Sequence, residues 1–317
     1  MSAKPLKLLF EAMYHGKYDV QDFLAGDIRK DFDVMTVNGR IIFRTNKKLK
    51  TYHTFLNLFV FEKFKINTSV VFSYRKGVNV VDAVSRHASS KHFFQADLSH
   101  FFSSIDASLV RSTIEANIGD TPIADVQNYL SRIIELVLVD ESLPIGFATS
   151  PTISNACLFE FDNALQKYCD EKELIYTRYS DDLIVSSKRR EDLVDIEEVI
   201  KKFLTEFFGG KMSLNEEKTK FTHVGSKIKL LGMVILPNGK VTVDIKWKKQ
   251  IEVFLHYYLK DRAKFFLMVE SDLASGLERI SGYLSYINTV DKDYLNKLRK
   301  KYGATVVDMF LHHSAKS

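Results

Sequence analysis

Apolar positions recur with two different periods along the chain, and the period predicts which segments fold as helices and which as strands. Residues 49–64 (LKTYHTFLNLFVFEKF) have apolar positions three and four apart, as in an amphipathic helix. Residues 39–45 and 92–98 are short β-prone runs and predict strands. Residues 175–187 (IYTRYSDDLIVSS) predict two strands joined by a tight turn at Tyr179–Asp182. Further helices are expected over residues 1–35, 78–90, 106–118, 122–139, 152–172 and 191–208 and from 246 onward.

Residues 227–243 (KIKLLGMVILPNGKVTV) predict a hairpin, because Pro-Asn-Gly between two β-prone runs is a strong turn signal. The chain therefore combines paired strands with long helices, and its sequence contains no internal repeat. This combination indicates an α+β fold rather than a regular alternation of strand and helix.

The composition indicates a folded chain with a sizeable core. Of its 317 residues, 45% are hydrophobic and 27% are charged, a length that suits two or three packed subdomains. Cys157 and Cys169 fit neither a zinc motif nor a disulfide framework, which favours a reducing, cytoplasmic compartment. We expect neither a signal peptide nor a membrane partner. Residues 1–20 lack an apolar segment with a cleavage site, and the apolar runs of the sequence are too short to span a bilayer.

The positive charge of the chain is concentrated near its C-terminus. The formal net charge is +5, and residues 245–317 carry 13 Lys and Arg against 8 Asp and Glu. Such a local excess favours a polyanionic partner such as nucleic acid, although an ordinary solvated surface has the same composition.

Asp181 and Asp182 stand side by side between the two strands predicted over residues 175–187. Adjacent carboxylates in a dry site either bind a cation or raise the pKa of one of them. Mg²⁺ suits oxygen ligands, and Asp97 follows another predicted strand. Three carboxylates on adjacent strands can hold two Mg²⁺ ions roughly 3.5–4 Å apart and promote phosphoryl transfer. The simpler alternative is that Asp is merely common in turns.

Three segments, in this order and spacing, resemble the palm of reverse transcriptases: QADLSHFF (95–102), LPIGFATSP (143–151) and RYSDDLIVSS (178–187). The resemblance covers about residues 39–243 and is greatest to short bacterial enzymes, the retron and defence-associated reverse transcriptases. It implies a right-hand polymerase fold with fingers, palm and thumb. The implied domains are an N-terminal helical segment (1–35), fingers and palm (36–244) and a basic helical thumb (245–317).

The resemblance also implies a role for individual residues. The metal ligands would be Asp97, Asp181, Asp182 and the Leu98 carbonyl. The incoming nucleotide would meet Arg40, Phe102 and Lys218, with Arg44 as a possible helper. The primer and template would meet Tyr179, Leu231, Gly232, Lys248 and Lys249.

Chemistry supports some of these roles and leaves alternatives for others. The guanidinium of Arg40 suits phosphate because its planar fork donates hydrogen bonds in pairs. Phe102 would exclude a ribose 2′-OH, but it would also suit a core position beside Phe101. Lys218 in a charged loop could be merely solvated. Ile145 stands where many relatives have Gln, so the contact made by that Gln would fall to backbone and shape.

We therefore expect an RNA-directed DNA polymerase that uses Mg²⁺, or Mn²⁺, to copy a cognate non-coding RNA into DNA from dNTPs. The resemblance further implies a retron-type role in anti-phage defence, with any effector as a separate protein. Protein-primed or template-independent DNA synthesis is an alternative within the same enzyme class. A catalytically idle RNA-binding scaffold and a divalent-ion nuclease are alternatives outside it.

Overall fold

The computed structural model describes residues 3–225, 228–269 and 273–312, in two compact units. The larger unit comprises residues 1–78 and 94–220, and the smaller unit comprises residues 79–93 and 221–317. Some parts of the predicted N-terminal segment, hairpin and thumb lie outside the described residues: 1–2, 227, 270–272 and 313–317.

The larger unit begins with helices that pack through aromatic side chains. Phe10, Phe23 and Phe55 are fully buried, and their rings lie within 5.5 Å of one another between centroids. The helix predicted over residues 49–64 is confirmed for most of its length, whereas residues 1–35 are helical only in part. The helices are α1 (Leu6–Tyr14), α2 (Val20–Ala25) and α3 (Lys47–Phe59).

A two-stranded hairpin interrupts these helices. Strand β1 (Phe32–Val37) pairs with β2 (Arg40–Thr45) through the turn at Asn38 and Gly39, whose φ angles are 50° and 74°. Asn-Gly suits a turn with two positive φ angles, which matches the twist of the flanking strands. The predicted strand over residues 39–45 is confirmed. The prediction of helix up to residue 35 is wrong at its end, because pairing with β2 draws residues 32–35 into a strand.

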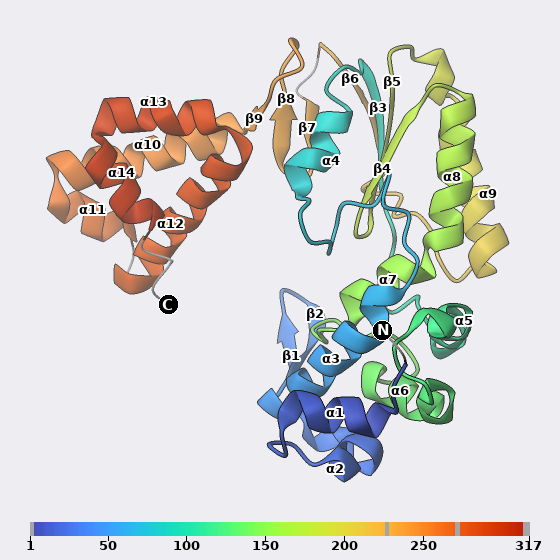
Figure 1. Cartoon of the computed structure of the whole chain (residues 1–317). Helices are drawn as coiled ribbons and strands as arrows, with labels where there is room; N and C mark the ends of the chain where they lie inside the picture. The colour runs from blue at the N-terminus through green and yellow to red at the C-terminus, as the bar shows by residue number, and fades with distance from the viewer. Residues whose placement is uncertain (1–2, 226–227, 270–272, 313–317) are drawn as a thin grey trace. The chain divides into compact units, whose positions relative to one another are not determined.

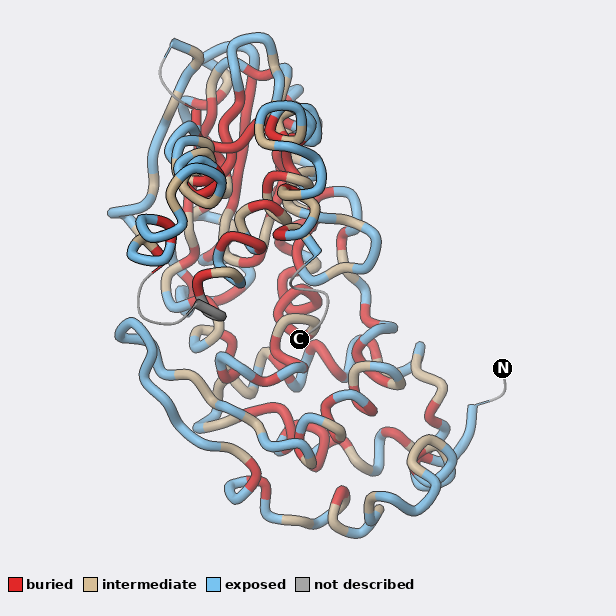
Figure 2. Tube along the Cα trace, turned by 90° about the vertical axis from the view of Figure 1, so that its left-hand side faces the viewer, coloured by how far each residue is buried: buried red, intermediate tan, exposed pale blue. Residues whose placement is uncertain are grey.

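A four-stranded sheet forms the centre of the chain, with the order β4-β5-β3-β6. The division between the two units passes through β3 and β6. Inner strands β3 and β5 are buried along much of their length, as Figure 2 shows. The strands predicted around the aspartates are confirmed. Their bounds are β3 (His92–Asp97), β4 (Ile175–Tyr179) and β5 (Asp182–Ser187). The edge strand β6 (Lys220–His223) was not predicted from the sequence.

Helices α8 (Phe159–Glu171) and α9 (Ile196–Phe208) lie side by side next to β4 and β5 (Figure 1). The single helix predicted over residues 152–172 is wrong, because α7 (Ser150–Cys157) ends and α8 begins around Leu158, whose ψ of 8° lies outside the helical range. Helices α5 (Ala107–Asn117) and α6 (Leu130–Val137) complete this unit.

The smaller unit contains α4 (Val80–Arg86) and a three-stranded sheet of order β7-β8-β9. The single hairpin predicted over residues 227–243 is incomplete. Pro-Asn-Gly does connect two strands, but Leu231 and Gly232, with φ angles of 47° and 84°, make a second tight turn. The strands are β7 (Ile228–Leu230), β8 (Met233–Ile235) and β9 (Val241–Val243).

The described residues from 246 onward are mainly helical, as predicted. Its core contains the buried side chains of Phe254, Leu284, Leu298 and Phe310. Among the described residues, no helix is both long enough and apolar enough to cross a membrane. The helices are α10 (Ile245–Lys260), α11 (Arg262–Val269), α12 (Leu273–Val290), α13 (Lys292–Tyr302) and α14 (Ala304–Leu311).

Candidate active site

The turn between β4 and β5 presents two carboxylates at one end of the sheet. Tyr179 pairs with Asp182 across the strands, which leaves Ser180 and Asp181 as the two turn residues. Ser180 has a φ of 61°, a left-handed conformation that is uncommon for residues other than glycine. The predicted turn is therefore confirmed, with Asp181 in the turn and Asp182 at the start of β5.

Asp97 lies at the end of β3, the strand next to β5 in the sheet. The backbone N–H of Leu98 donates to the Asp181 carbonyl at 3.0 Å, which joins the end of β3 to the β4–β5 turn. The Asp97 carbonyl in turn accepts from the N–H of Asn215 at 2.7 Å. The fold thus brings the three predicted carboxylate ligands to the same end of the sheet.

The three carboxylates act on one another electrostatically. Burial, followed by the negative charges of Asp181 and Asp97, raises the pKa of Asp182 from 3.8 to about 6. The positive charges of Lys218 and Lys220 act in the opposite direction. A carboxyl group whose pKa is raised in this way is more stable with a cation beside it.

Lys218 supplies one such cation. Its Nζ donates to both carboxylate oxygens of Asp97, at 3.0 and 2.9 Å, from the turn that precedes β6. In this arrangement no group of three His, Cys, Asp or Glu side chains among the described residues is gathered closely enough to hold a metal ion. The donor chemistry suits a hard divalent ion, since all three side chains are carboxylates. An ion bound at Asp97 would have to compete with Lys218 for this carboxylate.

The β1–β2 hairpin is joined to the LPIG segment by backbone contacts. The N–H of Phe43 donates to the Ile145 carbonyl at 2.8 Å. Gly146 has a φ of 109°, and a Cβ there would lie 2.4 Å from the Phe43 carbonyl oxygen, so only glycine fits. Arg40 and Arg44 are exposed on β2. Ile145 thus contributes its backbone carbonyl to holding the strand that carries both arginines.

Phe101 and Phe102 differ in their environments. Phe101 is buried, with 4% of its surface exposed, whereas Phe102 is half-buried. The two rings pack edge to face with centroids 5.2 Å apart. Phe101 therefore belongs to the core, and Phe102 keeps part of its ring accessible near the end of β3.

Tyr179 is half-buried beside the β4–β5 turn. Burial, together with the neighbouring Tyr74, raises the pKa of its phenol. The Tyr74 hydroxyl lies 3.0 Å from Oγ of Ser180, so a second tyrosine reaches the same turn.

The remaining predicted residues lie in the smaller unit. Leu231 and Gly232 form the β7–β8 turn. Nζ of Lys248 lies 3.2 Å from Oδ2 of Asp291 and 4.4 Å from the centre of the Tyr294 ring, and this side chain is only 18% exposed. Lys249 is exposed. Of the two lysines, Lys249 is therefore the one whose charge faces solvent.

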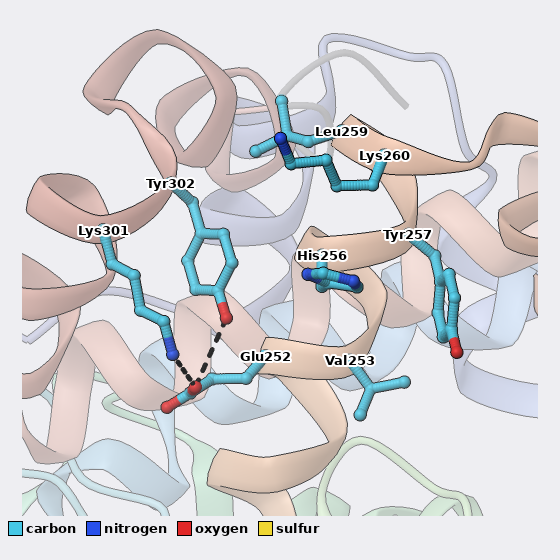
Figure 3. Close-up of a pocket in the computed structure, with 8 residues that line it drawn as sticks. All are labelled: Glu252, Val253, His256, Tyr257, Leu259, Lys260, Lys301 and Tyr302. Atoms are coloured by element: carbon cyan, nitrogen blue, oxygen red, sulfur yellow. Dashed lines mark hydrogen bonds and ion pairs between the residues drawn. The ribbon is translucent and has the colours of Figure 1, made fainter.

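A groove of about 490 Å³ lies between α10 and α13 (Figure 3). Glu252 lines this groove, and its Oε2 accepts hydrogen bonds from Nζ of Lys301 at 2.5 Å and from the Tyr302 hydroxyl at 3.3 Å. The sequence indicated the basic runs of this region, but it did not indicate that Glu252 would pair with one of their lysines. The lining residues are Glu252, Val253, His256, Tyr257, Leu259, Lys260, Lys301 and Tyr302.

Sequence reasoning also missed a buried ion pair next to the β4–β5 turn. Arg178 and Asp162 are both fully buried, with Nη2 and Oδ2 2.6 Å apart. The available signal was a charged residue inside a β-prone run, directly before Tyr179.

Known proteins that are similar to this chain point to one family. A family model described as reverse transcriptase (RNA-dependent DNA polymerase) matches residues 17–235. The retron Ec83 reverse transcriptase of Escherichia coli is 23% identical over 291 residues, covering 88% of each chain. The retron Ec73 reverse transcriptase of the same organism is 27% identical, covering 86% of each chain.

Among solved structures, the apo telomerase of Candida tropicalis matches with a TM-score of 0.51 and 13% identity. The match covers 89% of this chain but only 60% of the telomerase chain. At this identity the likeness concerns the fold alone.

Proposed function

The chain belongs to the reverse transcriptase family of RNA-dependent DNA polymerases, and we propose that it copies a cognate non-coding RNA into DNA by two-metal nucleotidyl transfer. We propose further that it does so as the polymerase of a retron-type anti-phage system. The observation that carries the mechanism is the convergence of Asp97, Asp181 and Asp182, with the pKa of Asp182 raised to about 6.

Several predictions from the sequence are confirmed at this level. The family, the activity as an RNA-directed DNA polymerase and the likeness to retron reverse transcriptases agree with the family model and the E. coli relatives. The polymerase fold agrees with the telomerase structure, and the α+β class with the described helices and strands. The boundaries at residues 35 and 244 remain predictions, as do the individual roles of the site residues.

Members of this family use divalent metal ions, and two Mg²⁺ ions would be held here by Asp97, Asp181 and Asp182, with the Leu98 carbonyl nearby. Bound divalent ions supply charge neutralisation and Lewis-acid activation for attack by the primer hydroxyl on the α-phosphate. Lys218 would have to leave Asp97 for divalent ions to bind there, and its ammonium group would then be free to meet the triphosphate.

Other side chains orient the substrates. Arg40, exposed on the β1–β2 hairpin, would pair with the triphosphate oxygens, with Arg44 beside it. The accessible part of the Phe102 ring would exclude a ribose 2′-OH. Tyr179 and the tight turn at Leu231–Gly232 would contact the primer end. Such positioning supplies much of the rate enhancement in phosphoryl transfer.

The smaller unit would hold the RNA–DNA duplex through its backbone. Lys249 and the groove of Figure 3 present lysine charge with tyrosine rings between, a combination suited to phosphates and sugars. Proteins recognise such a duplex mainly through its shape and backbone, so we expect this surface to bind with little sequence specificity.

Primer extension on an RNA template, with dNTPs and Mg²⁺, tests the proposed function. Wild-type protein should extend the primer, and Asp181→Asn should abolish extension while leaving the circular dichroism spectrum and unfolding midpoint close to those of wild type. Asp170→Asn, which changes an exposed aspartate on α8, is the matched control and should extend normally. Normal extension by Asp181→Asn would contradict the proposed site.

The same reactions separate the alternatives. DNA covalently attached to the protein would indicate protein priming, and extension without RNA would indicate template-independent synthesis. RNA binding without any metal-dependent incorporation would indicate an idle scaffold, and shortening of the nucleic acid would indicate a nuclease.

A further inference from the structure

Both backbone polar groups of Ser180 are held by buried side chains. Its N–H donates to Oγ of Ser73 at 2.7 Å, and its carbonyl accepts from Nη1 of Arg178 at 3.0 Å. Ser180 is the residue with a φ of 61° that directly precedes Asp181. A left-handed conformation is disfavoured for serine, and its surroundings must therefore hold it there.

A ring of hydrogen bonds connects the two groups that hold Ser180. Oδ1 of Asn155 accepts from Nη1 of Arg178 at 3.1 Å, and Nδ2 of Asn155 donates to the Ser73 carbonyl at 2.9 Å. Ser73 and Arg178 are fully buried and Asn155 is 2% exposed. We call Ser73, Asn155 and Arg178 the turn clamp.

Arg178 is fixed in turn by Asp162. Its Nε and Nη2 donate to the Asp162 carboxylate at 2.9 and 2.6 Å, and the Tyr176 hydroxyl donates to the same carboxylate at 2.8 Å. The guanidinium therefore has bidentate geometry on one side and reaches Asn155 and Ser180 on the other.

A buried ion pair adds little net stability, because the cost of desolvating two charges offsets much of their attraction. Well-packed apolar residues at the same positions often stabilise a fold equally well. Beyond Asp162, Arg178 donates to the Asn155 side chain and to the backbone carbonyl of Ser180, two positions before Asp182. Tyr74, itself in a left-handed conformation with a φ of 56°, adds a contact to the Ser180 hydroxyl. The arrangement suits a conformational role at the turn.

We propose that the turn clamp consists of positioning residues, which hold Ser180 in its left-handed conformation so that Asp181 and Asp182 face divalent ions together. The three clamp residues are buried, and their side chains bond to one another and to the backbone of Ser180. This inference rests on the proposed function, since it assigns the two aspartates as ligands.

Ser73→Ala tests the clamp with the smallest change, because it removes one acceptor and little volume. Mn²⁺ added to the purified protein alone, followed by electron paramagnetic resonance, measures binding at the site that Asp182→Asn abolishes. We expect Ser73→Ala to weaken this binding about tenfold, the effect of leaving one buried donor unpaired. Its kcat, calculated per folded protein, should fall while its KM for dNTP stays near the wild-type value.

Thr113→Ala is the matched control. Thr113 also has a buried hydroxyl in the larger unit, but this hydroxyl donates to Sγ of Cys157 at 3.4 Å and not to the β4–β5 turn. It should lower the unfolding midpoint by a similar amount and leave Mn²⁺ binding unchanged.

If Ser73→Ala does not fold, the double variant Arg178→Met/Asp162→Leu replaces it, because removing both charges avoids an unpaired buried ion. It should show the same loss of Mn²⁺ affinity. Wild-type affinity in a folded clamp variant would overturn the clamp. Failure of the wild-type protein itself to bind Mn²⁺ would instead contradict the proposed function.

Discussion

Replacing Asp182 by Asn is expected to stabilise the metal-free protein while abolishing DNA synthesis. Burial, and then the charges of Asp181 and Asp97, raises the pKa of Asp182 from 3.8 to about 6. At neutral pH the folded protein must therefore keep an ionised carboxylate where that form is disfavoured. Asparagine has nearly the same size and no charge, so it removes this cost.

The magnitude follows from the pKa. A rise from 3.8 to about 6 corresponds to about 3 kcal/mol, at about 1.36 kcal/mol per pH unit. Asp182 keeps part of its surface in water, and screening there reduces the expected gain to about 1–2 kcal/mol. Because the pKa is raised in the folded state, wild-type stability is lost as the pH rises from about 4 to about 6. At pH 4.5 the difference in unfolding free energy between Asp182→Asn and wild type should therefore be only about a third of its value at pH 7.5.

Urea unfolding in EDTA, followed by circular dichroism at pH 4.5 and 7.5, measures the gain. Asp170→Asn controls for the loss of one negative charge and should not differ from wild type at either pH. Saturating Mg²⁺ should narrow the difference, because it binds and stabilises the folded wild-type protein. The reasoning is refuted if Asp182→Asn is no more stable than wild type at pH 7.5, or if its gain does not depend on pH.

Three further substitutions probe other parts of the site. Lys218→Met should tighten Mn²⁺ binding a few-fold, because it frees Asp97, while slowing dNTP incorporation; unchanged Mn²⁺ affinity would contradict the competition between lysine and metal. Phe102→Ala should raise the ratio of rNTP to dNTP incorporation at least about tenfold in single-nucleotide assays, since the ring no longer excludes the 2′-OH. Gly146→Ala should lower the free energy of unfolding by about 2 kcal/mol or more, because its Cβ would overlap the Phe43 carbonyl; unfolding at the wild-type urea midpoint would argue against that contact.

The parts of the site that the sequence predicted well are those with a local signal. The runs on either side of Asp181 and Asp182 specify two strands and a two-residue turn, and HFFQAD specifies the strand before Asp97. Nearby residues determine these elements, so the position of each carboxylate could be read from the chain directly.

The parts that the sequence did not predict depend on distant residues. Ser73 and Ser180 are 107 positions apart, and Lys218 and Asp97 are 121 positions apart, so local pattern contains no trace of either contact. The third strand of the small sheet was missed for a different reason. The Leu231–Gly232 turn needs two positive φ angles, and leucine at the first position is not a turn signal.

The most direct test is to purify the protein from cells that express its native genomic neighbourhood and to sequence the nucleic acid bound to it. An Asp181→Ala/Asp182→Ala variant is treated in parallel, and RNase and DNase distinguish the products. We predict DNA that is present only with the wild-type protein and complementary to one bound RNA. Absence of such DNA from both proteins, with RNA bound equally to each, would contradict templated DNA synthesis and favour a scaffold.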